Sequence, residues 1–159
     1  MAAVDYFLKI DGIQGESQDK THKGDIEIGS FSWGETNTGT ARAGGGMGAG
    51  KVAMQDFHFV MGVNKSSPKL LLACANGEHI KSAILVCRKA GKEQQEYLKI
   101  TFTDLLISSF QTGGTEIMPT DQISFNYSKI EYEYKEQKAD GTLSGAIKAM
   151  YDVKQSSGS

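Results

Sequence analysis

Cysteine and proline are scarce in this chain, which has two of each among 159 residues but 19 glycines. Two thiols, Cys74 and Cys87, are too few for a disulfide framework. Both lie in apolar segments, where a free thiol packs as a small hydrophobic group. We therefore expect buried, unpaired cysteines. The glycine excess indicates many turns and bulges and favours an all-β fold.

The sequence also lacks long runs of basic residues and long runs of apolar residues. The formal net charge is −2, and no run of lysine or arginine could neutralise a phosphate backbone, so we expect no nucleic-acid partner. The longest apolar runs, residues 70–75 and 83–87, fall far short of the roughly 20 residues that cross a bilayer, so we expect no membrane insertion. The N-terminus lacks the basic and apolar regions of a signal peptide, and we expect the protein to start in the cytoplasm.

Motifs of catalysis, metal binding and cofactor binding are absent or incomplete. His22, His58 and His79 are isolated in the sequence and fit no zinc spacing. Residues 45–51 match a phosphate-binding loop, but Val52 replaces its final Ser or Thr, and a predicted strand follows instead of a helix. There is no G-x-S-x-G elbow. The sequence predicts a protein that is not an enzyme and has no cofactor, catalytic residue or metal site.

What the sequence does contain is alternation of apolar and polar residues with a period of two, which is typical of strands. Two such segments reverse parity, near Gly29 and after Tyr127, and we expect a bulge at each. Residues 36–50 are rich in glycine and predict a loop. The predicted strands cover residues 4–11, 26–33, 52–61, 82–88, 97–110, 122–135 and 146–153.

One short helix is expected at about residues 67–76. Ser66 offers a capping hydroxyl, Pro68 suits the first turn, and Asn76-Gly77 suits a left-handed C-terminal cap. So short a helix needs packing on the sheet, which we assign to Leu70, Leu71, Leu72 and Cys74. The predicted fold is mainly β: a small antiparallel β-barrel or sandwich of two sheets with one flanking helix, forming a single domain over residues 1–159.

A series of short segments is spread along residues 4–154. In chain order they are Gly15-Glu16-Ser17 with Asp19 and His22, Ser30-Phe31-Ser32-Trp33-Gly34, the glycine-rich loop, Lys51-Val52 with Gln55-Asp56-Phe57, Ser67-Pro68 with Ala73-Cys74-Ala75, Gly77 with His79, Arg88-Lys89-Ala90-Gly91, Glu96-Tyr97-Leu98, Leu106-Ile107-Ser108-Ser109 and Ala139-Asp140-Gly141. Together and in this order, the segments resemble the landmarks of the Hcp family, which forms the tube of the bacterial type VI secretion system.

The resemblance implies a function. Six copies would close into a homohexameric ring, and stacked rings would form a tube inside a contractile sheath, capped by a VgrG-type spike. The tube would be expelled with effector proteins in its lumen, so the chain would be cytoplasmic first and extracellular after firing. Two alternatives are an exported effector, for which the chain leaves no room for a toxin domain, and a free-standing β-barrel that binds a small ligand.

Two sets of residues become candidate sites. Ser32 lies between Phe31 and Trp33; if these face the core, Ser32 points outward, and the resemblance suggests that this face lines the lumen and meets cargo. Its alternative is a plain surface serine. The glycine-rich loop over residues 38–51 is a candidate contact between subunits or rings, the alternative being a solvated hairpin. Its candidate residues are Thr40, Arg42, Gly44, Gly45, Gly46, Met47, Gly48 and Lys51.

Overall fold

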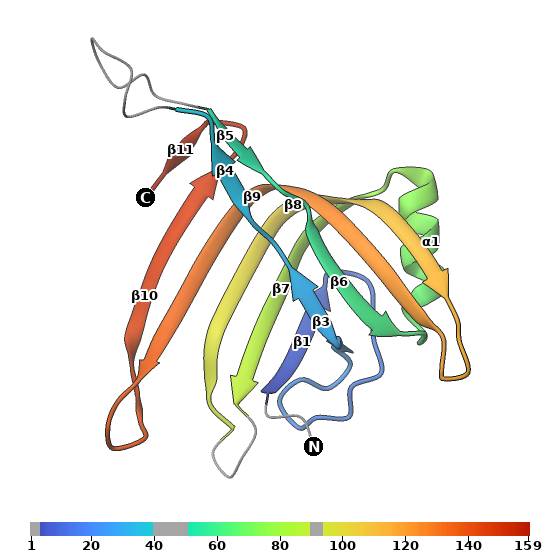
Figure 1. Ribbon diagram of the computed structural model, residues 1–159, viewed down its shortest axis with the longest axis horizontal. Helices are drawn as coiled ribbons and strands as arrows, with labels where there is room; N and C mark the ends of the chain where they lie inside the picture. Colours follow the sequence, from blue (N-terminus) through green and yellow to red (C-terminus); the bar gives the residue numbers. More distant parts are fainter. Residues whose placement is uncertain (1–3, 40–50, 90–93) are drawn as a thin grey trace.

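The computed structural model describes residues 4–39, 51–89 and 94–159. These ranges are mainly β-strand with one short helix, which confirms the expected fold class (Figure 1). The elements are β1 (Val4–Ile10), β2 (Ile26–Glu27), β3 (Ser30–Ser32), β4 (Glu35–Asn37), β5 (Val52–Met54), β6 (Phe57–Gly62), α1 (Ser67–Asn76), β7 (His79–Lys89), β8 (Glu96–Gly113), β9 (Thr120–Gln137), β10 (Leu143–Asp152) and β11 (Ser157–Gly158).

Two short strands close the main sheet into a barrel. Antiparallel pairing runs β1–β7–β8–β9, and β6 pairs with β9. β2 pairs with β1, and β3 pairs with β6. Between β2 and β3, the amide of Ile28 donates to Tyr6 O at 3.1 Å and that of Gly29 donates to Val60 O at 2.8 Å. The irregularity predicted at Gly29 is therefore a change of partner strand and not a bulge within one ladder.

In three neighbouring strands, the alternation of inward-facing and outward-facing side chains reverses along one line across the sheet. The buried positions on either side of this line are Ile80 and Ala83 in β7, Phe102 and Leu105 in β8, and Tyr127 and Ile130 in β9. The parity change after Tyr127 is confirmed, but the bulge is wrong, because the β8–β9 register is the same on both sides of it. Instead Asp104, on this line, has a left-handed φ of +55°. β8 and β9 arch over the core (Figure 1).

Aromatic side chains fill the barrel. The Phe57 ring centroid lies 4.9 Å from that of Phe102 and 5.1 Å from that of Phe125, and all three side chains are fully buried. Burying each ring contributes about 1.5–3 kcal/mol to folding. Phe31 and Trp33 pack against this core, as their parity predicted. This packing disfavours the alternative of a barrel that binds a small ligand in its interior.

The helix α1 has the predicted bounds, and its C-terminus is capped as expected. Gly77 has φ +61°, and the amide of Glu78 donates to Ala73 O at 3.0 Å. The predicted N-terminal cap is wrong: Ser66 has a helical backbone conformation, and its hydroxyl donates to Asn64 Oδ1 at 2.5 Å. A serine already in helical conformation is poorly placed to reach the free amides of the first turn.

The predicted buried face of α1 is wrong in part. Leu70 and Ala73 are buried, but Leu71 and Leu72 are 51% and 55% exposed, and Cys74 is half-buried. Successive helical residues are rotated by about 100°, so the two leucines that follow Leu70 turn away from the sheet. Both cysteines are unpaired, and burial raises the pKa of the Cys87 thiol to about 12.

The segment around the glycine-rich loop also differs from expectation. The loop predicted from residue 36 is still strand there, because β4 pairs with β5 in a separate two-stranded sheet. The strand predicted over residues 52–61 is interrupted at Gln55 and Asp56, since the amide of Gln55 donates to Gly34 O at 2.9 Å. The β4–β5 arm extends away from the barrel (Figure 1).

Candidate functional site

Ser32 lies in a row of polar side chains that crosses four strands. It is exposed at the end of β3 and pairs with His58 of β6, which pairs with Ser124 of β9. The next partner in β8 is Ser109, after the register shift that follows Ile107. His58 Nδ1 lies 2.9 Å from the Ser124 hydroxyl. The outward orientation predicted for Ser32 is confirmed by its exposure.

The surroundings of this row are also polar and mostly uncharged. The next row across the same strands contains Ser30, Val60, Gln122 and Gln111. On the other side, the carboxylate of Asp56 accepts a hydrogen bond from the Ser108 hydroxyl at 2.5 Å. We call the surface formed by Ser30, Ser32, His58, Ser109, Gln122 and Ser124 the hydroxyl face. Its hydroxyl, amide and imidazole groups suit hydrogen bonding with another polar surface.

A second hydrogen-bonded chain fixes the strands beneath the hydroxyl face. Trp33 Nε1 donates to the Tyr127 hydroxyl, which donates to Gln55 O at 3.0 Å. Burial raises the pKa of Tyr127 to about 12, so the phenol stays protonated and able to donate. This chain joins the segment after β3 to β9 and to the break between β5 and β6. It supports the orientation of Ser32 from the core side.

The predicted contact loop is mostly outside the described residues. Thr40, Arg42, Gly44, Gly45, Gly46, Met47 and Gly48 all fall in the range 40–50. Lys51 is described: its side chain is exposed, and its backbone oxygen accepts a hydrogen bond from the Thr38 amide at 3.5 Å. Lys51 therefore lies at the outer end of the β4–β5 arm, where the glycine-rich loop begins, and the arm separates it from Ser32.

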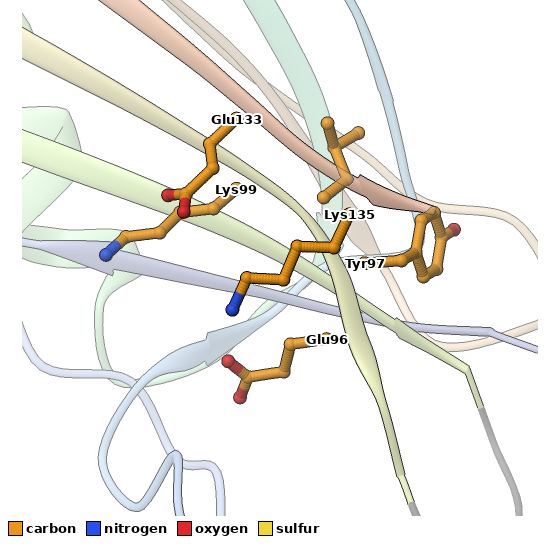
Figure 2. A pocket seen from close by; sticks show the side chains of 6 residues that line it. Glu96, Tyr97, Lys99, Glu133 and Lys135 are labelled. Atoms are coloured by element: carbon orange, nitrogen blue, oxygen red, sulfur yellow. The ribbon is translucent and has the colours of Figure 1, made fainter. Parts of the chain in front are cut away.

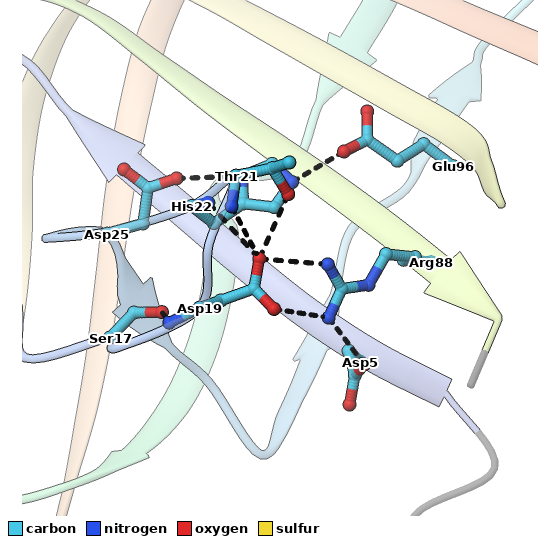
Figure 3. A network of polar contacts seen from close by, with 8 residues as sticks. All are labelled: Asp5, Ser17, Asp19, Thr21, His22, Asp25, Arg88 and Glu96. Atoms are coloured by element: carbon cyan, nitrogen blue, oxygen red, sulfur yellow. Dashed lines mark hydrogen bonds and ion pairs between the residues drawn. The ribbon is translucent and has the colours of Figure 1, made fainter. Parts of the chain in front are cut away.

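An ion-pair network holds residues 11–25 against the outer face of β1 and β7 (Figure 3). The two terminal nitrogens of Arg88 each donate to a carboxylate oxygen of Asp19 at 2.9 Å, and one also donates to Asp5 at 3.0 Å. The guanidinium lies over the Phe7 ring, 4.7 Å from its centroid. The hydrogen bonds from Arg88 hold the pKa of Asp19 well below its usual range.

His22 extends the same network. Its ring stacks on Phe7 with centroids 4.4 Å apart. Nδ1 lies 3.0 Å from Asp25 Oδ2 and Nε2 lies 2.6 Å from Glu96 Oε1. Only a doubly protonated ring can donate to both carboxylates at once. The sequence predicted that His22 is an ordinary loop residue. In the structure, the His22 side chain links residues 11–25 to the start of β8.

Alternating charges cover the outer face of β8 and β9 next to this network. Figure 2 shows Lys99 and Lys135 interleaved with Glu96 and Glu133 along a shallow pocket, beside Tyr97. Lys99 pairs with Glu133 across the two strands. Opposite charges in register stabilise strand pairing by a few tenths of a kcal/mol to about 1 kcal/mol. The outer surface of the barrel thus has a charged part and the nearly uncharged hydroxyl face.

The described residues assemble few of the parts of a catalytic or metal site. His58 and Ser124 form a pair, yet within residues 4–39, 51–89 and 94–159 no recorded hydrogen bond joins His58 to a carboxylate that would orient it as a base. No cluster of three or more His, Cys, Asp or Glu in those ranges could hold a metal ion. The same ranges contain no helix long and apolar enough to span a bilayer.

Comparisons with known proteins give this fold a context. A family model described as "Type VI secretion system effector, Hcp" matches residues 7–134. Protein hcp1 of Pseudomonas aeruginosa is 43% identical over 157 residues, covering 96% of this chain and 97% of the relative. The crystal structure of Hcp1 from Salmonella typhimurium superposes with a TM-score of 0.83 at 38% identity, covering 99% of this chain and all of the other.

A third relative has a similar structure. The crystal structure of a type VI secretion system effector from Yersinia pestis gives a TM-score of 0.76 at 35% identity, over 94% of this chain and all of the other. The fold and these matches define a component of the type VI secretion system. Within that class, the chain belongs to the Hcp family, and the resemblance found in the sequence is confirmed.

Proposed function

We propose that this chain is the inner-tube subunit of a type VI secretion system. Six copies close into a ring, and rings stack into a tube that is expelled with effector proteins in its lumen. The observation that carries the proposal is the match to Hcp1 proteins over nearly the whole length of both chains. The barrel adds support, because its two different outer surfaces give each subunit non-identical patches, as a ring of identical chains requires.

The partners follow from this role. The tube meets a contractile sheath outside and a VgrG-type spike at its tip, and the protein moves from the cytoplasm to the exterior on firing. The work of such a subunit is assembly and binding rather than catalysis, so we propose no enzymatic activity, cofactor or metal. The test is the native mass by light scattering, with negative-stain images of the same peak. Ring particles near six times 17.2 kDa support the role, and a monomer at all concentrations refutes it.

Ser32 and the hydroxyl face are the proposed cargo surface. The polar and mostly uncharged character of this face supports the proposal, because it can bind by hydrogen bonds without the cost of desolvating several charges. Replacing Ser32 with Trp should reduce co-purification of a co-expressed effector while leaving the ring intact. Thr103→Trp, at an exposed position of β8 away from this face, is the control. Equal retention by both variants would make Ser32 a plain surface serine.

The glycine-rich loop is the proposed contact between subunits or rings. Its support is the β4–β5 arm, which carries both ends of the loop away from the barrel. Replacing Gly44, Gly45 and Gly46 with Leu should leave the thermal unfolding of the barrel unchanged and reduce ring or tube particles in electron micrographs. Arg42, Met47 and Lys51 supply the larger side chains of the same contact, with Thr40 and Gly48 at its flanks. Unchanged particle populations would identify a solvated hairpin.

A further inference from the structure

Large apolar side chains that the barrel leaves uncovered gather at two ends of the molecule. Within the described residues, the exposed ones are Val63, Leu71, Leu72, Ile117, Met118, Tyr132, Tyr134 and Ile147. The first five belong to α1, the turn before it, and the hairpin between β8 and β9. The last three belong to β9 and β10. Figure 1 places α1 and that hairpin at one end of the long axis and β10 at the other.

The cluster on β9 and β10, which we call the tyrosine end, continues the core side of the sheet. Tyr134 pairs with Ile147 of β10 and with Leu98 of β8. Tyr132 is two residues along the strand on the same side, as is the buried Ile130. These side chains therefore point in the direction of the core but lie beyond the part of the barrel that closes over it. Ile147 is 68% exposed.

The other cluster, which we call the helix end, combines three segments. Leu71 and Leu72 lie on the outward side of α1, and Ile117 and Met118 lie in the β8–β9 hairpin, with Ile117 79% exposed. The amide of Val63 donates to Pro119 O at 3.2 Å, which ties the turn before α1 to this hairpin. The apolar residues of the helix end are thus held on a connected scaffold.

We propose that the helix end of one subunit docks on the tyrosine end of a second copy of the same chain. The inference rests on the proposed ring and names the surfaces that form it. Its support is that the two clusters are different and lie at opposite ends of the long axis, which is the arrangement that a head-to-tail contact needs. A two-fold dimer through either end would bury one cluster and leave the other in water, where exposed apolar surface favours further association.

The side chains at the two ends are also chemically complementary. Aliphatic and methionine side chains at the helix end can pack against the faces of Tyr132 and Tyr134, while the phenol hydroxyls stay at the rim. Aromatic residues and methionine are enriched in the buried centres of protein interfaces.

The test uses two full-length variants, each with one altered end. Tyr134→Glu/Ile147→Glu alters the tyrosine end, and Leu71→Glu/Leu72→Glu alters the helix end. Matched controls place the same charge nearby on other surfaces: Lys148→Glu, next to Ile147 on the opposite side of β10, and Lys69→Glu on α1. Circular dichroism and thermal unfolding verify that each variant folds. Native mass is then measured by light scattering, for each variant alone and for an equimolar mixture.

We expect both controls to keep the ring mass and each altered variant alone to be monomeric. The mixture should contain heterodimers of twice the chain mass and nothing larger, because one intact tyrosine end meets one intact helix end. Rings in either altered variant, or a mixture that stays monomeric, would overturn the assignment of these surfaces. An unaltered chain that is monomeric would instead refute the proposed ring itself, so the two failures are distinguishable.

Discussion

Arg88 is a charged side chain that the fold encloses almost completely, with 4% of its side chain exposed. Asp19, from the segment that crosses the outer face, meets it with two parallel hydrogen bonds. A bidentate pair of this kind is stronger than a single contact between point charges. The segment 11–25, which has little regular structure, is thereby joined to β7 by a buried ion pair.

The pH dependence of stability tests this pair. The pKa of Asp19 is lowered in the fold, so its contribution is present above the ordinary carboxyl pKa and is lost as the pH falls below that value. We expect Asp19→Asn to lower the unfolding free energy at pH 7 by roughly 2–4 kcal/mol. The difference from the unaltered chain should shrink between about pH 4 and pH 2, measured by urea unfolding.

Asp5→Asn is the control for that prediction. Asp5 makes one hydrogen bond to Arg88 and is about a third exposed, so its loss should cost less at pH 7. A difference between Asp19→Asn and the unaltered chain that stays constant down to pH 2 would contradict the role of Asp19.

The Trp33–Tyr127–Gln55 chain has its own test, because Trp33 is the single tryptophan of the sequence. Tyr127→Phe removes the acceptor of Trp33 and the donor to Gln55, leaving two polar groups near the core unpaired. We expect a loss of about 1–3 kcal/mol in urea unfolding and a shift of the Trp33 emission maximum. Tyr132→Phe, at an exposed phenol, should change neither. Equal stability of both variants would show that the chain is dispensable.

At the scale of single elements, features that depend on neighbouring residues could be predicted from the sequence. Features that depend on residues distant in the sequence could not. The ends of α1 were predictable because Pro68 and Gly77 act through their own backbone. The buried face of α1 could not be predicted, because the position of the sheet decides whether Leu70 or Leu71 is buried. The break at Gln55 was equally hidden, because it depends on Gly34 and Tyr127, which are remote in sequence.

The corrected face of α1 makes a direct prediction. Leu70→Ala should destabilise the fold by about 2–5 kcal/mol, because Leu70 is fully buried and its loss leaves a cavity. Leu71→Ala should change the unfolding free energy by less than about 0.5 kcal/mol. Both are measured by chemical denaturation of dilute protein whose monomeric state has been verified by light scattering. Similar losses for the two variants would contradict the orientation of the helix.

At the scale of the whole molecule, the hydroxyl face shows what a sequence can and cannot predict. Alternation around Ser32 was enough to orient that side chain outward. The neighbours His58, Ser124 and Ser109 come from three other strands, and their register is set by long-range pairing. Likewise the family landmarks Asp19, His22, Arg88 and Glu96 meet only in the folded chain. Their spacing in the sequence carries no sign of that meeting.

The line along which β7, β8 and β9 change parity passes through Asp104, whose φ of +55° lies in the left-handed region. Asp and Asn tolerate this conformation better than other non-glycine residues, and a β-branched side chain does not. We expect Asp104→Gly and Asp104→Asn to stay within about 0.5 kcal/mol of the unaltered chain. Asp104→Val should lose at least about 1–2 kcal/mol, measured by urea unfolding. Comparable stability of the Val and Gly variants would mean that β8 bends elsewhere.

The barrel is closed by β2 and β3, strands of two and three residues, while β8 and β9 each have eighteen. Local opening begins where few hydrogen bonds must break, so we expect the barrel to open at this junction before the long hairpin separates. Ser32 sits on the short side of it. A proposed cargo surface with one yielding edge and three rigid strands can adjust to cargoes of different shape, and the remainder of the subunit need not be remodelled for each one.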